Sequence, residues 1–138
     1  MTAIKSITAI ALVSFTMQTD FLAEQKKFER VRAALNEKQE LLNKILRENK
    51  ISSDNINVIF VAYKDNDLLD VYAKTKKETS YRKLLSYSIC SRSGQLGPKR
   101  KQGDGQVPEG FYHIDRFNPK SNFHLSLGLN YPNLSDKR

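Results

Sequence analysis

Apolar residues between positions 20 and 50 recur at spacings of three, four and seven, as they do on one face of an amphipathic helix. The stripe consists of Phe21, Phe28, Val31, Leu35, Leu42, Ile45 and Leu46. Because no Gly or Pro lies within this segment, we expect one uninterrupted helix over residues 20–50, capped by Asp20 and ending at Asn49. Its polar face carries three oppositely charged pairs, Glu24 with Lys27, Glu29 with Arg32, and Glu40 with Lys44. A helix docked on its own domain explains the stripe better than a coiled-coil seam, since the heptads are not sustained.

After residue 55 the pattern changes to short runs of strand-forming residues. The segment "INVIFVAY" (56–63) is apolar on both faces and predicts a central, buried strand. "KDND" (64–67) predicts a turn into a second strand at 68–74, so that the two strands form a hairpin. Further strands are expected at 81–90, 111–115 and 123–130. The fold class is therefore mainly β with an N-terminal α-helix (α+β) and antiparallel strands.

The last expected strand alternates strictly between apolar and other residues. Its apolar positions are Phe123, Leu125, Leu127 and Leu129. This face needs a cover, which residues 131–138 do not obviously provide.

The first residues resemble an export signal. Lys5 is followed by a run of mostly apolar and small residues from Ile7 to Phe15, which is too short to span a bilayer. We expect a signal peptide over residues 1–19 and an exported, periplasmic or cell-envelope location without a stable membrane anchor, since no Cys follows the run directly. The alternative is an N-terminal core helix.

The chain has 138 residues, enough for one domain, and carries a net charge of +8 with an isoelectric point near 9.6. Two classes of partner fit this charge: nucleic acid, or an anionic surface or polymer outside the cytoplasm. Export favours the second class over the first.

A loop rich in glycine and basic residues, "GPKRKQGDGQVPEGFYHI" (97–114), raises the question of phosphate binding. Gly105 and Gly110 have the spacing of a P-loop, but Phe111 and Tyr112 stand where its Lys and Ser/Thr would be. A strand rather than a helix is expected next, so the helix dipole is also missing. The dinucleotide pattern fails because Pro108 occupies the place of its third glycine. Phe111 and Tyr112 fit the core of a strand better than a stacking platform for bases.

Few residues are candidates for chemistry. The single cysteine, Cys90, ends an apolar run and is expected to be a buried structural thiol rather than a nucleophile. His113 and His124 are the only histidines, both fall in expected strands, and two histidines alone do not make a metal site. These residues do not assemble an active site.

The order of features around the loop resembles the L,D-transpeptidase (YkuD-type) catalytic domain family, in its YafK-like branch. The resemblance covers roughly residues 55–136 and is carried by a G-P-K-R segment, a G-D pair, a P-x-G segment leading into a strand, and the run "NPKSNFHLSLGLNYPN" (118–133). The matching loop residues are Gly97, Pro98, Lys99, Arg100, Gly103, Asp104, Pro108 and Gly110, which would line a cleft or serve the structure. The resemblance implies an exported enzyme that uses a cysteine nucleophile on peptidoglycan stem peptides, forms an acyl-enzyme, and crosslinks or hydrolyses them. It implies no metal and no organic cofactor.

This sequence departs from the family at the catalytic motif. The family places a His-Gly pair and then Ser/Thr-x-Gly-Cys after the segment matched here, and neither motif occurs in these residues. Cys90, His113 and His124 precede or fall outside the matching positions, so no catalytic residue is assigned in this chain. We therefore expect residues 51–138 to be the N-terminal part of a truncated catalytic domain, inactive and marginally stable by itself. The alternatives are a non-catalytic cell-wall-binding module and a small basic nucleic-acid-binding protein.

Overall fold

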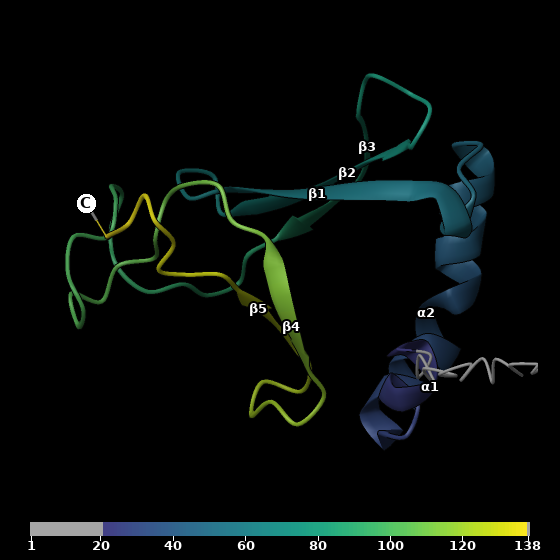
Figure 1. Cartoon of the computed structure of the whole chain (residues 1–138), viewed down its shortest axis with the longest axis horizontal. Coiled ribbons are helices and arrows are strands. Elements are labelled where there is room, and N and C mark those ends of the chain that lie inside the picture. The colour runs from purple at the N-terminus through teal and green to yellow at the C-terminus, as the bar shows by residue number, and fades with distance from the viewer. Residues whose placement is uncertain (1–20, 138) are drawn as a thin grey trace, which may run out of the picture.

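A computed structural model describes residues 21–137 of the chain. The expected signal peptide and the expected cap at Asp20 lie outside this range. The elements, in order, are α1 (Phe21–Gln25), α2 (Glu29–Glu48), a 3-10 turn (Ser53–Asn55), β1 (Ile56–Tyr63), β2 (Leu68–Thr75), β3 (Arg82–Ser88), β4 (Ile114–Asn118) and β5 (Ser126–Leu129). Both sheets are antiparallel, which confirms the expected β-rich α+β class (Figure 1). No helix in the described range is long and apolar enough to cross a membrane.

The helical segment is not continuous, and the prediction of one helix over 20–50 is wrong at this point. Phe28 has extended backbone angles, with φ −89° and ψ 129°, and separates α1 from α2. The Arg32 guanidinium donates hydrogen bonds to the carbonyl oxygens of Lys26 (2.8 Å) and Lys27 (2.9 Å), which satisfies backbone groups that the break leaves without helical partners.

Of the three charge pairs expected on the helix, only Glu24–Lys27 forms within residues 21–137, at 2.6 Å. Arg32 contacts the backbone at the break, and Lys44 lies 3.9 Å from Glu48 rather than beside Glu40. The predicted end is confirmed, since Asn49 donates both its backbone N–H and its side-chain Nδ2 to the carbonyl oxygen of Ile45.

The three-stranded sheet has the order β1-β2-β3 and is built from consecutive hairpins. The turn at 64–67 is confirmed, with Tyr63 paired to Leu68 and Asp67 in the left-handed region at φ 49°. The expectation that 56–63 is a central, buried strand is wrong, because a meander places its middle strand in the centre and β1 at the edge. As a result, Val58, Ile59 and Phe60 are exposed.

The second sheet contains only β4 and β5, and both strands begin three residues later than expected. Residues up to His113 stay irregular, although Asn130 Oδ1 accepts the His113 N–H at 2.7 Å. Before β5, His124 adopts φ 73°, which breaks the extended backbone that the alternation assumed. Phe123 therefore lies in a turn and is 88% exposed.

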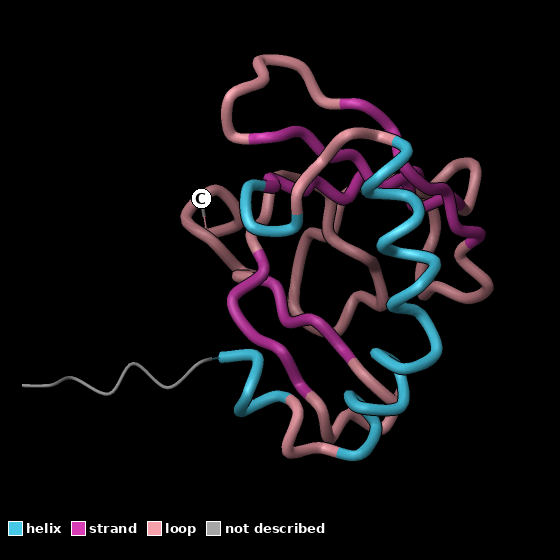
Figure 2. Tube along the Cα trace, turned by 90° about the vertical axis from the view of Figure 1, so that its right-hand side faces the viewer, coloured by secondary structure: helices cyan, strands magenta, loops and turns pink. Residues whose placement is uncertain are grey.

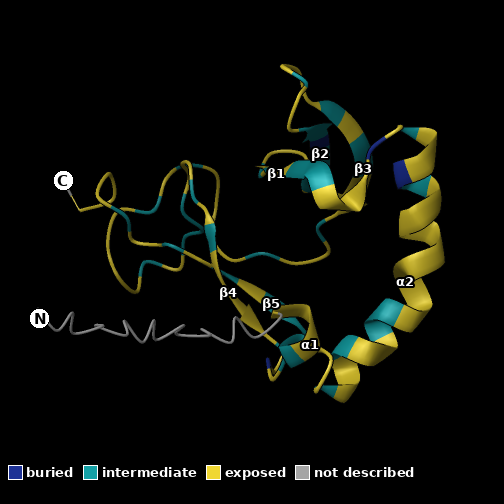
Figure 3. Ribbon diagram, turned by 45° about the vertical axis from the view of Figure 1, so that its right-hand side comes forward, coloured by how far each residue is buried: buried dark blue, intermediate teal, exposed yellow. Residues whose placement is uncertain are grey.

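Helix α2 contacts both sheets, one near each of its ends. Near its C-terminal end, Leu46 packs with Ile51 and Ala73 of β2 in the buried core cluster of the described residues, with Ile56 and Leu84 beside them. Near its N-terminal end, Arg30 donates hydrogen bonds to the carbonyl oxygens of the turn before β5, those of Ser121 (2.8 Å) and His124 (3.2 Å). Figures 2 and 3 show the helix running beside both sheets, and Figure 3 shows few buried positions in dark blue.

Because this core is small, we expect the stability of the fold to depend strongly on Leu46. Replacing Leu46 with Ala removes buried methylene groups at the junction of helix and sheet and should lower the free energy of unfolding by about 2–3 kcal/mol, measured by urea denaturation. The matched control is Leu41→Ala on the same helix, where the side chain is 54% exposed and the effect should stay below about 1 kcal/mol. Equal losses in the two variants would show that α2 does not dock through Leu46.

Candidate functional site

The signature loop, defined as residues 97–110, is held by one lysine from another part of the chain. Lys64 lies in the turn between β1 and β2, and its Nζ donates to the carbonyl oxygens of Gly97 (2.7 Å) and Val107 (3.1 Å). The same ammonium lies 2.9 Å from Glu109 Oε1, and the Lys64 side chain is only 11% exposed. An ammonium group has three N–H donors, so these partners satisfy all of them.

Glu109, at the C-terminal end of the loop, binds both Lys64 and Gly97. Its Oε1 also accepts the backbone N–H of Gly97, at 3.2 Å. The hydrogen bond from Lys64 lowers the pKa of Glu109, against the opposing effect of burial. The two ends of the signature loop are thus tied to each other and to the β1–β2 turn.

A second charged centre organises the middle of the loop. The Asp104 carboxylate pairs with Lys99 and accepts the backbone N–H groups of Arg100 (2.8 Å), Lys101 (3.0 Å) and Gln106 (3.0 Å). The side chains of Asp104 and Lys99 are 12% and 15% exposed. The hydrogen bond from Lys99, with the three backbone donors, holds the pKa of Asp104 well below the usual carboxyl range.

The chain entering the loop is tied to the same β1–β2 turn. Arg92 pairs with Asp67 at 2.6 Å and donates to the carbonyl oxygen of Gly94 at 3.1 Å. Gln106 Oε1 accepts the backbone N–H of Gln95 at 2.6 Å. Gly94 has φ 75°, and a Cβ there would lie 2.8 Å from the Gln106 Cα and from the Gly105 carbonyl oxygen, backbone atoms that cannot easily move, so this position requires glycine.

The structure divides the eight expected loop residues into separate roles. Gly97 meets Lys64 and Glu109, whereas Lys99 and Asp104 form a separate pair within the turn. Gly97 and Gly103 both have positive φ, at 104° and 79°, as tight turns require. Pro98, Pro108 and Gly110 contribute backbone shape, and Arg100 is exposed. The eight residues are therefore neighbours in one ordered loop, but they do not converge on one point.

The basic cluster 99–101 is divided in the same way. The charge of Lys99 is neutralised by Asp104, while Arg100 and Lys101 are exposed and neither side chain has an ion-pair partner among residues 21–137.

Sequence reasoning missed the residues that hold the loop in place, Lys64, Asp67 and Arg92, and gave Glu109 no role beyond its place in the motif. Lys64 lies in a polar turn, where a solvated lysine is the usual expectation. A contact across 33 residues, such as that from Lys64 to Gly97, leaves no local signal in the sequence.

The candidates for chemistry are placed differently from the expectation. Cys90 is a free, exposed thiol, so the prediction of a buried one is wrong; β3 ends at Ser88, before Cys90 could enter the sheet. His113 and His124 both lie outside the strands, contrary to expectation. Phe111 is fully exposed rather than part of a strand core, because β4 begins only at Ile114. No group of three or more potential metal-ligating side chains occurs in the described part of the chain.

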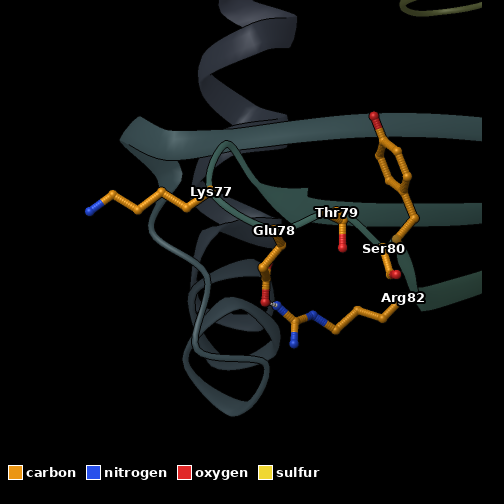
Figure 4. A pocket seen from close by; sticks show the side chains of 6 residues that line it. Lys77, Glu78, Thr79, Ser80 and Arg82 are labelled. Atoms are coloured by element: carbon orange, nitrogen blue, oxygen red, sulfur yellow. Dashed lines mark hydrogen bonds and ion pairs between the residues drawn. The ribbon is translucent and has the colours of Figure 1, made fainter.

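Three of the hollows among the described residues lie outside the loop. One, of about 400 Å³, is an open depression at the β2–β3 turn lined by residues 77–82, where Glu78 pairs with Arg82 at 2.5 Å (Figure 4). A second, of about 310 Å³, is mainly apolar and lies between the helices and the β4–β5 hairpin, with Phe21, Val31, Leu35, Phe117 and Leu127 among its lining residues. A third, of about 320 Å³, is lined by residues 28–30, 119 and 120. None of the three includes a residue of the signature loop.

The comparison with curated proteins supports the L,D-transpeptidase resemblance. Two relatives are similar to this chain: the protein called "Putative L,D-transpeptidase YafK" in Escherichia coli strain K12 and its counterpart in Escherichia coli O157:H7. Each is 40% identical to this chain over 77 residues, which cover 54% of this chain and 30% of the relative. The similarity confirms the resemblance to the YafK-like L,D-transpeptidase family, and the matched stretch spans less than a third of the relatives' length. No family profile matches the chain, and no solved structure matches it.

The Asp104 centre predicts a specific defect. Asp104→Ala removes the acceptor of three backbone N–H groups, so the amides of Arg100, Lys101 and Gln106 should exchange with solvent faster at pH 7, measured as protection factors by NMR. The control is Asp65→Ala in the exposed β1–β2 turn, which should leave these amides unchanged.

The same centre predicts a pH dependence. Because the folded-state pKa of Asp104 is depressed, its stabilising effect is complete above the ordinary carboxyl pKa of about 4 and is lost as the pH falls towards the lowered pKa. Protection of the three amides in the wild-type protein should therefore decline below about pH 4, after correction for intrinsic exchange. Protection that stays constant from pH 7 to pH 2 would contradict an ionised Asp104 as the acceptor.

Proposed function

We propose that this chain is part of an L,D-transpeptidase-type protein that recognises peptidoglycan stem peptides in the cell envelope. The observation that carries the proposal is the 40% identity with the two YafK relatives over 77 residues. The ordered signature loop supports it, since the residues that define the family resemblance form one connected structure rather than a scattered match.

We further propose that these 138 residues bind the wall peptide without catalysing acyl transfer. The reaction needs a thiolate activated by a base, with N–H donors placed for the oxyanion. The single cysteine, Cys90, is preceded by "YSI" rather than by Ser/Thr-x-Gly, and the expected His-Gly pair does not occur. Export, with residues 1–19 as the signal peptide, would place the chain beside its substrate.

Two alternatives to an enzyme part are a module that binds the cell wall and a protein that binds nucleic acid. The charge distribution of the loop favours the first. A polyanion is typically held by several Lys and Arg side chains in a row. Here the run of three basic residues presents only Arg100 and Lys101, because Lys99 is paired internally with Asp104. The second candidate function is therefore a non-catalytic module that binds the cell wall.

The proposal is tested with the 138-residue chain and purified muropeptides that carry tetrapeptide stems. We expect the chain to be retained by peptidoglycan sacculi and to yield no crosslinked or trimmed muropeptide by mass spectrometry. Cys90 should gain no acyl group, and Cys90→Ser should behave as the wild-type chain does. Failure of the wild-type chain to bind sacculi would overturn the peptidoglycan assignment, and an acyl adduct on Cys90 would overturn the non-catalytic role.

A further inference from the structure

The signature loop contains two carboxylates, and both are neutralised inside the loop structure. Glu109 pairs with Lys64, and Asp104 pairs with Lys99. The side chains of Lys64, Lys99 and Asp104 are at most 15% exposed, whereas that of Glu109 is 42% exposed but has its charge balanced by Lys64 at 2.9 Å. Arg100 and Lys101 are left as exposed cations without a counter-charge in the described residues.

The backbone that carries these two cations is fixed before any ligand arrives. Asp104 Oδ2 accepts the N–H groups of both Arg100 and Lys101, and Gly103, at φ 79°, closes the turn. A ligand that binds two side chains on such a turn pays little for ordering the backbone.

We propose that Arg100 and Lys101 form a carboxylate-binding site for the peptidoglycan stem peptide, with Lys64 as the positioning residue that holds the loop around it. The proposal rests on the proposed function and names its recognition element. A guanidinium presents parallel N–H donors that match a carboxylate, and the adjacent ammonium adds a further donor. Two cations suit one anionic group, whereas a phosphate polymer would require a longer basic track.

Lys64 acts at a distance from the ligand. It joins Gly97 at one end of the loop to Val107 and Glu109 at the other, and so closes the chain on both sides of residues 100 and 101. If this contact is lost, Asp104 still holds the backbone of Arg100 and Lys101, but the two ends of the loop that position this turn are released.

The test compares two variants that remove the same charge. Arg100→Gln with Lys101→Gln removes two cations from the loop, and Lys76→Gln with Lys77→Gln removes two exposed cations from the β2–β3 turn, where Figure 4 shows Lys77 extending away from its neighbours. We expect the loop variant to bind a soluble stem tetrapeptide about tenfold more weakly or worse, and the turn variant to bind within about twofold of wild type. Equal affinity losses in both variants, or none in the loop variant, would overturn the site even if the wild-type chain binds sacculi.

The positioning role of Lys64 is tested by measuring both peptide affinity and protease cleavage of the loop. Lys64→Met should weaken tetrapeptide binding and also speed trypsin cleavage after Arg100 and Lys101, because an open loop admits the protease. Where Lys64→Met fails to fold by circular dichroism, Glu109→Gln keeps the lysine and its two carbonyl contacts and should show the same changes to a smaller degree. Weakened binding with unchanged cleavage would contradict a positioning role.

The chemical nature of the ligand is decided by three probes. A stem tetrapeptide with free carboxylates should bind, the same peptide with amidated carboxylates should bind at least tenfold more weakly, and inorganic phosphate should not compete at equal concentration. Unchanged binding of the amidated peptide would overturn the carboxylate assignment. Tighter binding of single-stranded DNA than of the tetrapeptide would show that the site belongs to nucleic acid instead.

Discussion

The conformation of the loop that links this chain to its relatives depends on one ammonium group. Lys64 reaches from a hairpin turn to two carbonyl oxygens and a carboxylate that lie at opposite ends of the loop. Removing a cation from water is costly unless its donors are all satisfied, and here each N–H has an acceptor. The β1–β2 hairpin therefore does more than pair two strands, because its turn also presents Lys64 and Asp67 to the segment 89–109.

Because the apolar core is small, polar contacts stabilise much of the loop and of the β4–β5 hairpin. In the described residues the buried apolar positions are Leu46, Ile51 and Ala73, all where α2 meets the three-stranded sheet. The loop and the β4–β5 hairpin lie away from this cluster and are held by side-chain contacts to backbone, such as those of Asp104 and Arg30. Several large apolar side chains stay exposed, Phe111 and Phe123 among them.

Local signals in the sequence predicted local features well. The bounds of the β1–β2 hairpin, the end of the helix at Asn49 and the antiparallel α+β class all follow from periodicity and turn residues. Features set by distant contacts were not predictable in this way. The break at Phe28 and the enclosure of Lys64 depend on partners that no short pattern encodes, and the late start of β5 depends on a turn at His124 that the alternation concealed. For the site, the pattern of the loop showed the resemblance to the family, but it did not show which of its basic residues face solvent.

A double-mutant cycle on Lys64 and Glu109 tests the central claim most directly. The readout is the hydrogen-exchange protection of the Gln95 amide, which bonds Gln106 and contacts neither mutated side chain. If the shared ammonium organises the loop, Lys64→Met lowers this protection more than Glu109→Gln does, and the double variant falls no further than Lys64→Met alone. Additive losses, or protection that survives Lys64→Met, would contradict the account.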